Sequence, residues 1–135
     1  MVSGQCNCGE VQYSVDAETS GVIRCHCSIC RRASGANGIA IVVAPADRFV
    51  WVSGQNSVTS WQKPDSDWKT GFCNVCGSPA PGENDAMNAM FIPAGSLTEG
   101  ADELNVDQHI WVDSKASWDV IGDQGMQHPE GFPAS

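Results

Sequence analysis

The spacing of the cysteines constrains this chain more than any other feature of its sequence. Two pairs, CNCG and CNVCG, contribute Cys6 with Cys8 and Cys73 with Cys76, and a glycine directly follows each pair. A glycine allows a positive φ at that position, so backbone N–H groups can turn toward the sulfurs. Four thiolates complete a tetrahedral structural zinc site. We therefore predict that these four cysteines hold one zinc ion and join the start of the chain to its second half. Burial as free cysteines in a core is the alternative.

The other three cysteines lie close together in the segment RCHCSIC. Cys25, Cys27 and Cys30 offer three ligands and leave one position open, which is the pattern of a catalytic or ligand-binding zinc site. His26 is a possible fourth ligand, but on an extended segment it points away from the side on which Cys25 and Cys27 lie. A metal-free, redox-active group is a further alternative. We predict a second zinc site with one open ligand position here.

The type of ligand indicates the chemistry of this second site. Three thiolates give a zinc centre a formal charge of −1, which makes it a weak Lewis acid. Such a centre is better suited to a substrate thiolate than to forming hydroxide, and coordination deprotonates a thiol near neutral pH. Arg24, Arg31 and Arg32 border the group and can bind carboxylates of the thiol ligand. Their alternative role is that of ordinary solvated arginines.

Charge and hydropathy exclude several classes of partner. The net charge is −9, so we expect no binding to nucleic acid or to an anionic membrane surface through bulk charge. No apolar run approaches the roughly 20 residues of a membrane span, and the start of the sequence, MVSGQCNCGE, does not resemble a signal peptide. The odd number of cysteines argues against a complete disulfide framework. We expect a cytoplasmic protein of undetermined oligomeric state whose partner is a small thiol.

The hydrophobic pattern predicts a mainly β protein. Fourteen glycines and seven prolines divide the chain into short extended pieces. The predicted strands are 11–16, 38–45 (buried on both faces), 48–54, 57–62, 68–73, 90–95 and 109–112, with 48–73 as a meander. A helical turn is expected at 31–34. We assign one domain to residues 1–121, an irregular tail to 122–135, and core positions to three or four of the five tryptophans.

Several blocks of this sequence resemble one known family, that of the glutathione-dependent formaldehyde-activating enzymes and centromere protein V. The matching blocks are GQCNCGEVQYSV (4–15), CHCSICRRASGA (25–36), GFCNVCGS (71–78), AGSLTE (94–99) and HIWVDSKASW (109–118). The resemblance implies twisted antiparallel β-sheets of the β-tent type, held by a structural zinc at Cys6, Cys8, Cys73 and Cys76. It implies a second zinc at Cys25, Cys27 and Cys30 that engages the thiol of glutathione.

The resemblance also implies an activity, which is the carbon–sulfur lyase or synthase reaction that joins formaldehyde and glutathione in S-(hydroxymethyl)glutathione. Glutathione is then the co-substrate. His109, Ser114 and Lys115, in the last block, are candidates for protonating the product oxygen or contacting substrate. The competing functions are a non-catalytic zinc- or thiol-binding protein and a protein-interaction module.

Overall fold

The computed structural model describes residues 1–133 and is mainly β, as the sequence predicts. The chain forms two compact units. The first contains residues 1–20 and 42–103, and the second contains 21–41 and 104 onward. Each unit holds one of the two cysteine groups.

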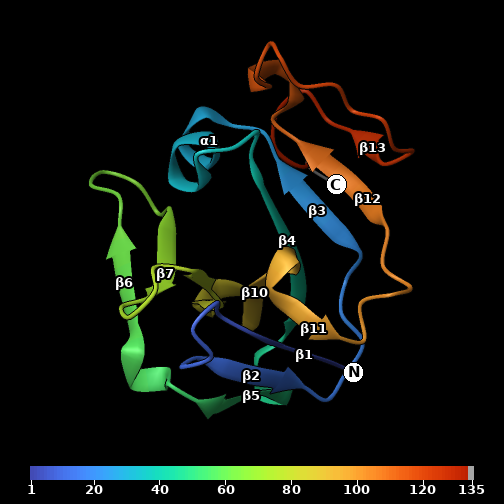
Figure 1. The fold of residues 1–135 in the computed structure, drawn as a ribbon. Coiled ribbons are helices and arrows are strands. Elements are labelled where there is room, and N and C mark those ends of the chain that lie inside the picture. Colours follow the sequence, from blue (N-terminus) through green and yellow to red (C-terminus); the bar gives the residue numbers. More distant parts are fainter. Residues whose placement is uncertain (134–135) are drawn as a thin grey trace. The chain divides into compact units, whose positions relative to one another are not determined.

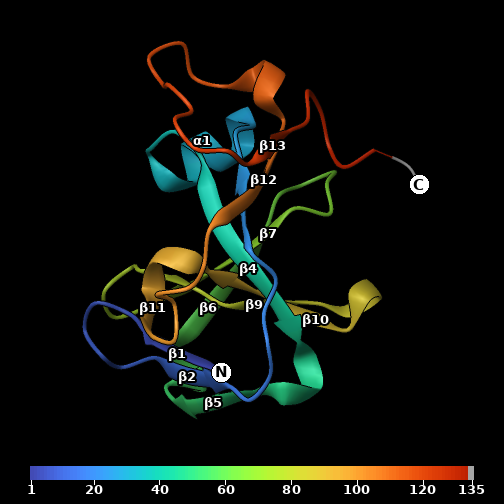
Figure 2. The ribbon, with the colours of Figure 1, turned by 90° about the vertical axis from the view of Figure 1, so that its right-hand side faces the viewer.

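The first unit contains a four-stranded antiparallel sheet in the order β11-β1-β2-β5, part of which Figure 2 shows with β1, β2 and β5 side by side. Its strands are β1 (Val2–Gln5), β2 (Gln12–Val15), β5 (Phe49–Ser53) and β11 (Leu97–Glu99). Tyr13 and Val15 are buried on one face of β2, which confirms the alternation predicted there. The ring of Tyr13 stacks on that of Phe49 with centroids 5.5 Å apart. These residues form the core of this sheet.

A separate three-stranded sheet in the same unit carries the second cysteine pair. It consists of β6 (Val58–Gln62), β7 (Lys69–Cys73) and β8 (Pro79–Ala80), with β6 and β7 forming a hairpin (Figure 1). The predicted meander is therefore wrong for its first strand, because β5 pairs with β2 and not with β6. The remaining strands are β9 (Gly82–Asn84) and β10 (Ala89–Pro93), which pair antiparallel.

Strand β4 (Ile39–Pro45) begins in the second unit and ends in the first. Val42 and Ala44 are fully buried, whereas Ile41 and Val43, on the other face, are only half-buried. The prediction of a strand was right, but burial on both faces was not, because only one face of the strand is completely covered.

The second unit contains parallel strand pairs, which the sequence did not predict. Strand β12 (Val106–Ile110) runs parallel to both β3 (Val22–Cys25) and β13 (Met126–Gln127), and β3 runs antiparallel to the start of β4. The short helix α1 (Ser28–Ser34) follows β3 and includes the predicted turn at 31–34. It ends at Gly35, which has a φ of +68°.

The segment after residue 122, expected as an irregular tail, contains the short strand β13 and is hydrogen-bonded to β12 and its extension. The amide of His128 donates to the carbonyl of His109 at 2.9 Å, and that of Trp111 donates to the carbonyl of Glu130 at 2.7 Å. The assignment of a single domain to 1–121 stays a prediction. Among residues 1–133, no helix is long and apolar enough to cross a membrane.

The tryptophans do not fill the core as expected. Trp61, Trp111 and Trp118 are exposed, while Trp51 and Trp68 are half-buried. The fully buried positions are occupied instead by Tyr13, Ile92, the histidines His26 and His109, and several valines.

Candidate functional site

Two tight turns present the cysteine pairs of the first unit. In one turn the amide of Gly9 donates to the carbonyl of Cys6 at 3.1 Å, and in the other the amide of Gly77 donates to that of Cys73 at 2.7 Å. Gly9 has a φ of +79° and Gly77 one of +78°, as the sequence predicted. The amide of Val11 donates to the sulfur of Cys6 at 3.3 Å. The turns thus point backbone donors at sulfur.

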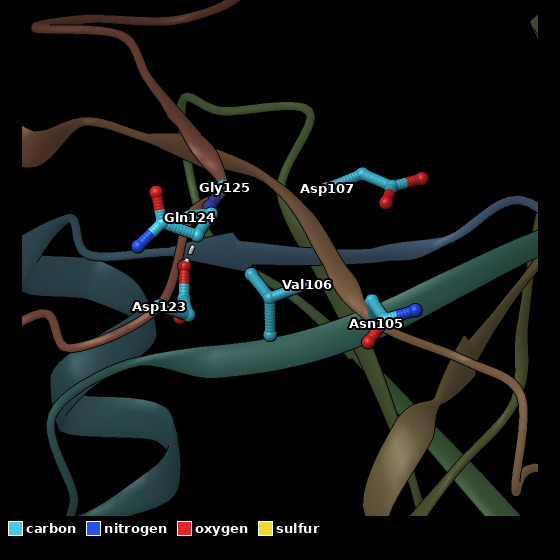
Figure 3. A pocket seen from close by; sticks show the side chains of 6 residues that line it. All are labelled: Asn105, Val106, Asp107, Asp123, Gln124 and Gly125. Atoms are coloured by element: carbon cyan, nitrogen blue, oxygen red, sulfur yellow. Dashed lines mark hydrogen bonds between the residues drawn. The ribbon is translucent and has the colours of Figure 1, made fainter.

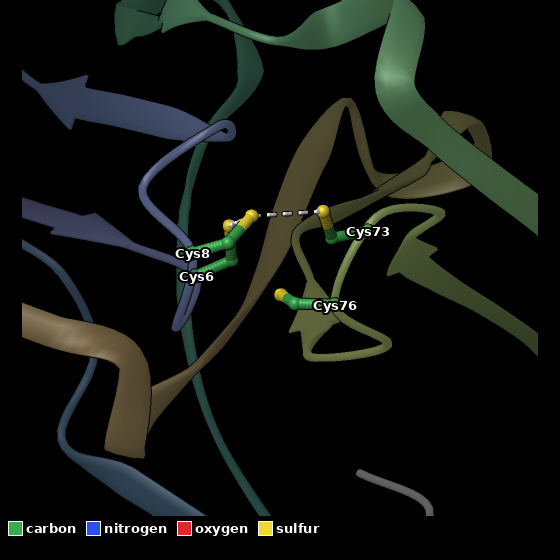
Figure 4. A group of neighbouring side chains, drawn as sticks. All are labelled: Cys6, Cys8, Cys73 and Cys76. Atoms are coloured by element: carbon green, nitrogen blue, oxygen red, sulfur yellow. Dashed lines mark hydrogen bonds between the residues drawn. The ribbon is translucent and has the colours of Figure 1, made fainter.

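The four sulfurs of Cys6, Cys8, Cys73 and Cys76 converge (Figure 4) and all lie within 4.8 Å of one another. The Sγ atoms of Cys6 and Cys8 are 3.5 Å apart, and those of Cys8 and Cys73 are 3.8 Å apart. Sulfurs placed tetrahedrally around zinc are separated by about 3.8 Å. The hydrogen bond with Ser78 lowers the pKa of the Cys76 thiol to about 5, which favours the thiolate that a metal requires. The donor set fits a zinc ion.

The three-cysteine group lies where β3 passes into α1. Cys25 ends β3, Cys27 is the N-cap of α1, and Cys30 lies in the first turn of that helix. The amide of Cys30 donates to the sulfur of Cys27 at 3.3 Å, and the three sulfurs lie within 4.8 Å of one another. The helix start therefore gathers three ligands, and no fourth His, Cys, Asp or Glu ligand joins them among the described residues.

Electrostatic coupling within the three-cysteine group favours one thiolate. The hydrogen bond with Cys30 lowers the pKa of the Cys25 thiol to about 6, although burial opposes this shift. The same contact raises the pKa of Cys30, which keeps its proton. Cys25 and Cys27 are half-buried and Cys30 is buried. The group thus offers a thiolate near neutral pH and remains partly open to solvent.

His26 does not join the sulfurs. Its side chain is fully buried, and its Nε2 atom lies 2.8 Å from Nδ1 of His109. Its Nδ1 atom lies 3.8 Å from Oδ2 of Asp119 and has no hydrogen-bond partner. Burial lowers the pKa of His26 and favours a neutral ring. These contacts occupy the side of the segment opposite to the thiols.

The hydrogen bonds continue on both sides of the histidine pair. His109 Nε2 lies 2.8 Å from Oδ1 of Asp123, and Oδ1 of Asp119 accepts from Nδ2 of Asn37 at 2.9 Å. Asp119 and Asp123 did not stand out in the sequence, because isolated acids in loops carry no motif. Only the parallel pairing of β3 with β12, which sets His109 opposite Arg24, brings the two histidines together.

His109 belongs to this histidine network, and Lys115 lies close enough for its charge to help lower the pKa of His26 and Asp119. Lys115 donates its Nζ to the carbonyls of Ala116 and Asp119, and His109 is fully buried. Ser114 ends the short 3-10 helix Val112–Ser114.

Among the three arginines, Arg32 is exposed, whereas Arg24 and Arg31 are half-buried. The Nε atom of Arg31 is buried without a hydrogen-bond partner. Its N–H group is therefore a donor that the described protein atoms leave unused.

A separate hollow of about 450 Å³ lies in the second unit (Figure 3). Asn105, Val106, Asp107, Asp123, Gln124 and Gly125 line it. Asp123 both lines this hollow and contacts the buried His109. Its Oδ1 atom accepts from His109 and from the amide of Gly125.

Fold and cysteine geometry together define a mainly β protein with two thiolate groups suited to metal. Residues 1–114 match the sequence profile of the family described as glutathione-dependent formaldehyde-activating enzyme, and the chain belongs to this family.

One similar protein, from Halomonas elongata, is provisionally named a glutathione-dependent formaldehyde-activating enzyme. It is 33% identical over 84 residues, which cover 58% of this chain and 53% of the relative. The chain thus spans about half the length of that relative. A crystal structure of a Rhodobacter sphaeroides protein has a similar fold, with a TM-score of 0.56 and 24% identity over 75% of this chain and 91% of that one.

Proposed function

We propose that this chain is a zinc-dependent carbon–sulfur lyase that catalyses the reversible addition of glutathione to formaldehyde. The observation that carries the proposal is the group of Cys25, Cys27 and Cys30, which offers three sulfur ligands at a partly exposed helix start. A zinc ion held there keeps one ligand position for an incoming thiolate. Family membership supports the same assignment.

The reaction needs few groups from the protein. The sulfur of glutathione forms a bond to the carbonyl carbon, the carbon–oxygen π bond opens, and the proton lost by the thiol ends on the product oxygen. The reverse reaction breaks the carbon–sulfur bond and returns the proton to sulfur. The protein must orient the thiol and keep it deprotonated. A zinc ion held by the three cysteines would favour the deprotonated thiol, and the neighbouring arginines would orient the ligand.

The arginines are proposed to bind the carboxylates of glutathione. Arg31 and Arg32 lie on α1 directly after Cys30, and the buried Nε of Arg31 has an unused donor. The exposed guanidinium of Arg32 and the accessible part of Arg31 can pair with a carboxylate. Arg24 has a different environment, since its charge helps to lower the pKa of both Asp119 and Asp123. We assign it to the histidine side of the segment.

The first group, Cys6, Cys8, Cys73 and Cys76, is proposed to hold a structural zinc. None of the seven cysteines, all of which lie in the described part of the chain, forms a disulfide; this suits a reducing compartment, and we propose the cytoplasm. The net charge of −9 supports small molecules and not nucleic acid as partners.

A thiol-binding protein without turnover is the second candidate. It is favoured by the positions of His109 and Lys115, because His109 is fully buried and Lys115 is bonded to two carbonyls. Neither is presented as a free proton donor to an open site. In that case the product oxygen would take its proton from water.

The deciding experiment has two parts. Zinc per chain is measured with and without glutathione, and the rate of S-(hydroxymethyl)glutathione formation is followed by NMR exchange. We expect two zinc ions in the presence of glutathione and a rate that rises with protein concentration. Two zinc ions with no rate increase would support binding alone, and one zinc ion in both samples would overturn the proposed site.

A further inference from the structure

The histidine contacts behind the three-cysteine group form one buried hydrogen-bonded chain within the second unit. Asp123 Oδ1 lies 2.8 Å from His109 Nε2, and His109 Nδ1 lies 2.8 Å from His26 Nε2. Both histidine side chains are 0% exposed, whereas that of Asp123 is 34% exposed. The chain therefore runs from the solvent side of the unit to the residue between Cys25 and Cys27.

The carboxylate at one end of this chain sets the direction of the hydrogen bond to His109. An ionised carboxylate only accepts, so His109 donates from Nε2. When each ring carries one proton, Nδ1 of His109 accepts and His26 donates from its Nε2. A single acid thus selects one tautomer at each of two buried rings.

The far end of the chain connects to the cysteines through the backbone. The amide of His26 donates to the carbonyl of Ile110 at 3.0 Å, and Cys25 is paired with Ile110 in the parallel register. The ring of His26 adds a second attachment on the face opposite to the thiols. Together they restrict the rotation of the segment that carries the sulfurs of Cys25 and Cys27.

The turn that contains Asp123 is itself held against His109. The amide of Gly125 donates to Oδ1 of Asp123 at 2.8 Å, and a Cβ atom at Gly125 would lie 3.0 Å from Cδ2 of the His109 ring. The acid therefore cannot leave the ring without moving the turn. Figure 3 shows Asp123 and Gly125 joined at the edge of the hollow.

We propose that His109 and Asp123 are positioning residues for the three-cysteine group, acting through His26 to hold Cys25 and Cys27 in the geometry that binds metal. This inference rests on the metal-holding role proposed above. Residues that hydrogen-bond directly to a metal ligand typically change the metal affinity by about 10- to 100-fold when they are removed, and residues that act through a neighbour of the ligands are expected at the lower end of this range.

The test is a titration with Co²⁺ of protein that retains its tightly bound zinc, followed by thiolate-to-cobalt absorption. No thiol or aldehyde substrate is present. The variant Cys27→Ser identifies the signal of the three-cysteine group. His109→Leu, which removes the acceptor for His26, is expected to weaken Co²⁺ binding by about tenfold and to alter the absorption bands.

Two further variants separate positioning from simple loss of packing. His109→Asn leaves an acceptor near the position of Nδ1 and is expected to recover most of the affinity. Asp123→Ala, at the exposed end of the chain, is expected to weaken Co²⁺ binding severalfold while the protein remains folded. The matched control is His128→Gln. Nε2 of His128 lies 2.6 Å from Oε1 of Gln108, which is on the same strand as His109, but His128 is not part of the hydrogen-bonded chain that leads to His26.

The outcomes are distinct. Unchanged Co²⁺ affinity and absorption in folded His109→Leu would overturn the proposal, and so would an unchanged Asp123→Ala if His109→Leu does not fold. A wild-type protein with no more Co²⁺ signal than Cys27→Ser would instead overturn the metal site and with it the proposed function. Weaker binding in His109→Leu and Asp123→Ala, with wild-type behaviour in His128→Gln, would support the positioning role.

Discussion

Cys27 has two tasks within one turn, which makes its substitution informative. Its sulfur belongs to the three-cysteine group and also accepts from the amide of Cys30 as the N-cap of α1. Serine is a good N-cap but a poor zinc ligand. We expect Cys27→Ser to abolish glutathione binding in calorimetry while the midpoint of thermal unfolding changes little.

The comparison with Cys27→Ala isolates the cap. Loss of an N-cap costs about 1 kcal/mol, so alanine should lower the unfolding midpoint more than serine while abolishing thiol binding equally. Retained glutathione binding in either variant would contradict the role assigned to the three cysteines.

The ionisation of Asp123 makes the stability of the second unit depend on pH in acidic solution. The hydrogen bond from His109 lowers the pKa of Asp123 from its ordinary value of 3.8. The unfolded chain therefore binds more protons than the folded chain just below that value, so stability rises with pH there. The stabilisation is fully present above pH 3.8 and is lost as the pH falls through the lower, folded pKa.

We expect the difference in unfolding midpoint between wild type and Asp123→Ala to shrink as the pH is lowered from about 6 to about 3. Thermal unfolding followed by circular dichroism at several pH values measures it. A difference that stays constant over this range would show that the Asp123 carboxylate adds nothing in its charged form.

At the scale of elements, the connection from α1 to β4 limits what the three-cysteine group tolerates. Gly38 has a φ of +147°, and a Cβ atom there would lie 2.2 Å from the carbonyl oxygen of Cys25. Gly35 has a φ of +68°, but a Cβ atom would meet nothing within 4 Å. A substitution at Gly35 therefore tests the backbone conformation alone, whereas a substitution at Gly38 also tests the close contact with Cys25.

We expect Gly35→Ala to cost about 1 kcal/mol from the left-handed backbone alone. Gly38→Ala should cost more and should also weaken metal binding by displacing Cys25. Urea unfolding together with the Co²⁺ titration measures both. Equal costs and unchanged Co²⁺ affinity would contradict the close approach of Gly38 to Cys25.

The elements that the sequence predicted are those set by local pattern. Strand β2 followed from the alternation of Val11, Tyr13 and Val15, and the β6/β7 hairpin followed from two short extended pieces near each other in the chain. The sequence did not predict that β5 pairs with β2 or that β3 pairs with β12. The pairing of segments distant in the chain depends on packing and not on the residue pattern of each segment.

At the scale of the whole molecule, the two cysteine groups should differ in what their loss does. Cys73 is fully buried, and it packs with Cys6 and Val11 in a core that also contacts Trp51 and Val58. Metal held at such a group carries folding free energy on the order of 10 kcal/mol. We expect Cys73→Ser to unfold much of the protein.

Near-ultraviolet circular dichroism and urea unfolding of Cys73→Ser, beside Cys27→Ser as the control, measure the difference. Equal destabilisation by the two substitutions would contradict the assignment of one structural and one exchangeable group.

The division of the cysteines into a group of four and a group of three could be predicted from the sequence, because cysteine spacing is local. The contacts of the neighbouring histidines and acids could not be predicted in this way. His26 and His109 lie far apart in the chain, and Asp119 and Asp123 belong to a loop without periodicity, so only the folded register reveals their contacts. The cysteines that the structure brings together were therefore predictable from local spacing, whereas the residues that surround them were not.

The backbone at Gly9 and Gly77 has a left-handed conformation that no genetically encoded L-amino acid prefers. Both residues have a positive φ, and a Cβ atom at either would meet nothing within 4 Å. A D-amino acid prefers this mirror-image region of backbone space and restricts the unfolded chain more than glycine does. D-alanine, introduced by semisynthesis at either position, should therefore make the protein more stable than the natural glycine does, whereas L-alanine should make it less stable.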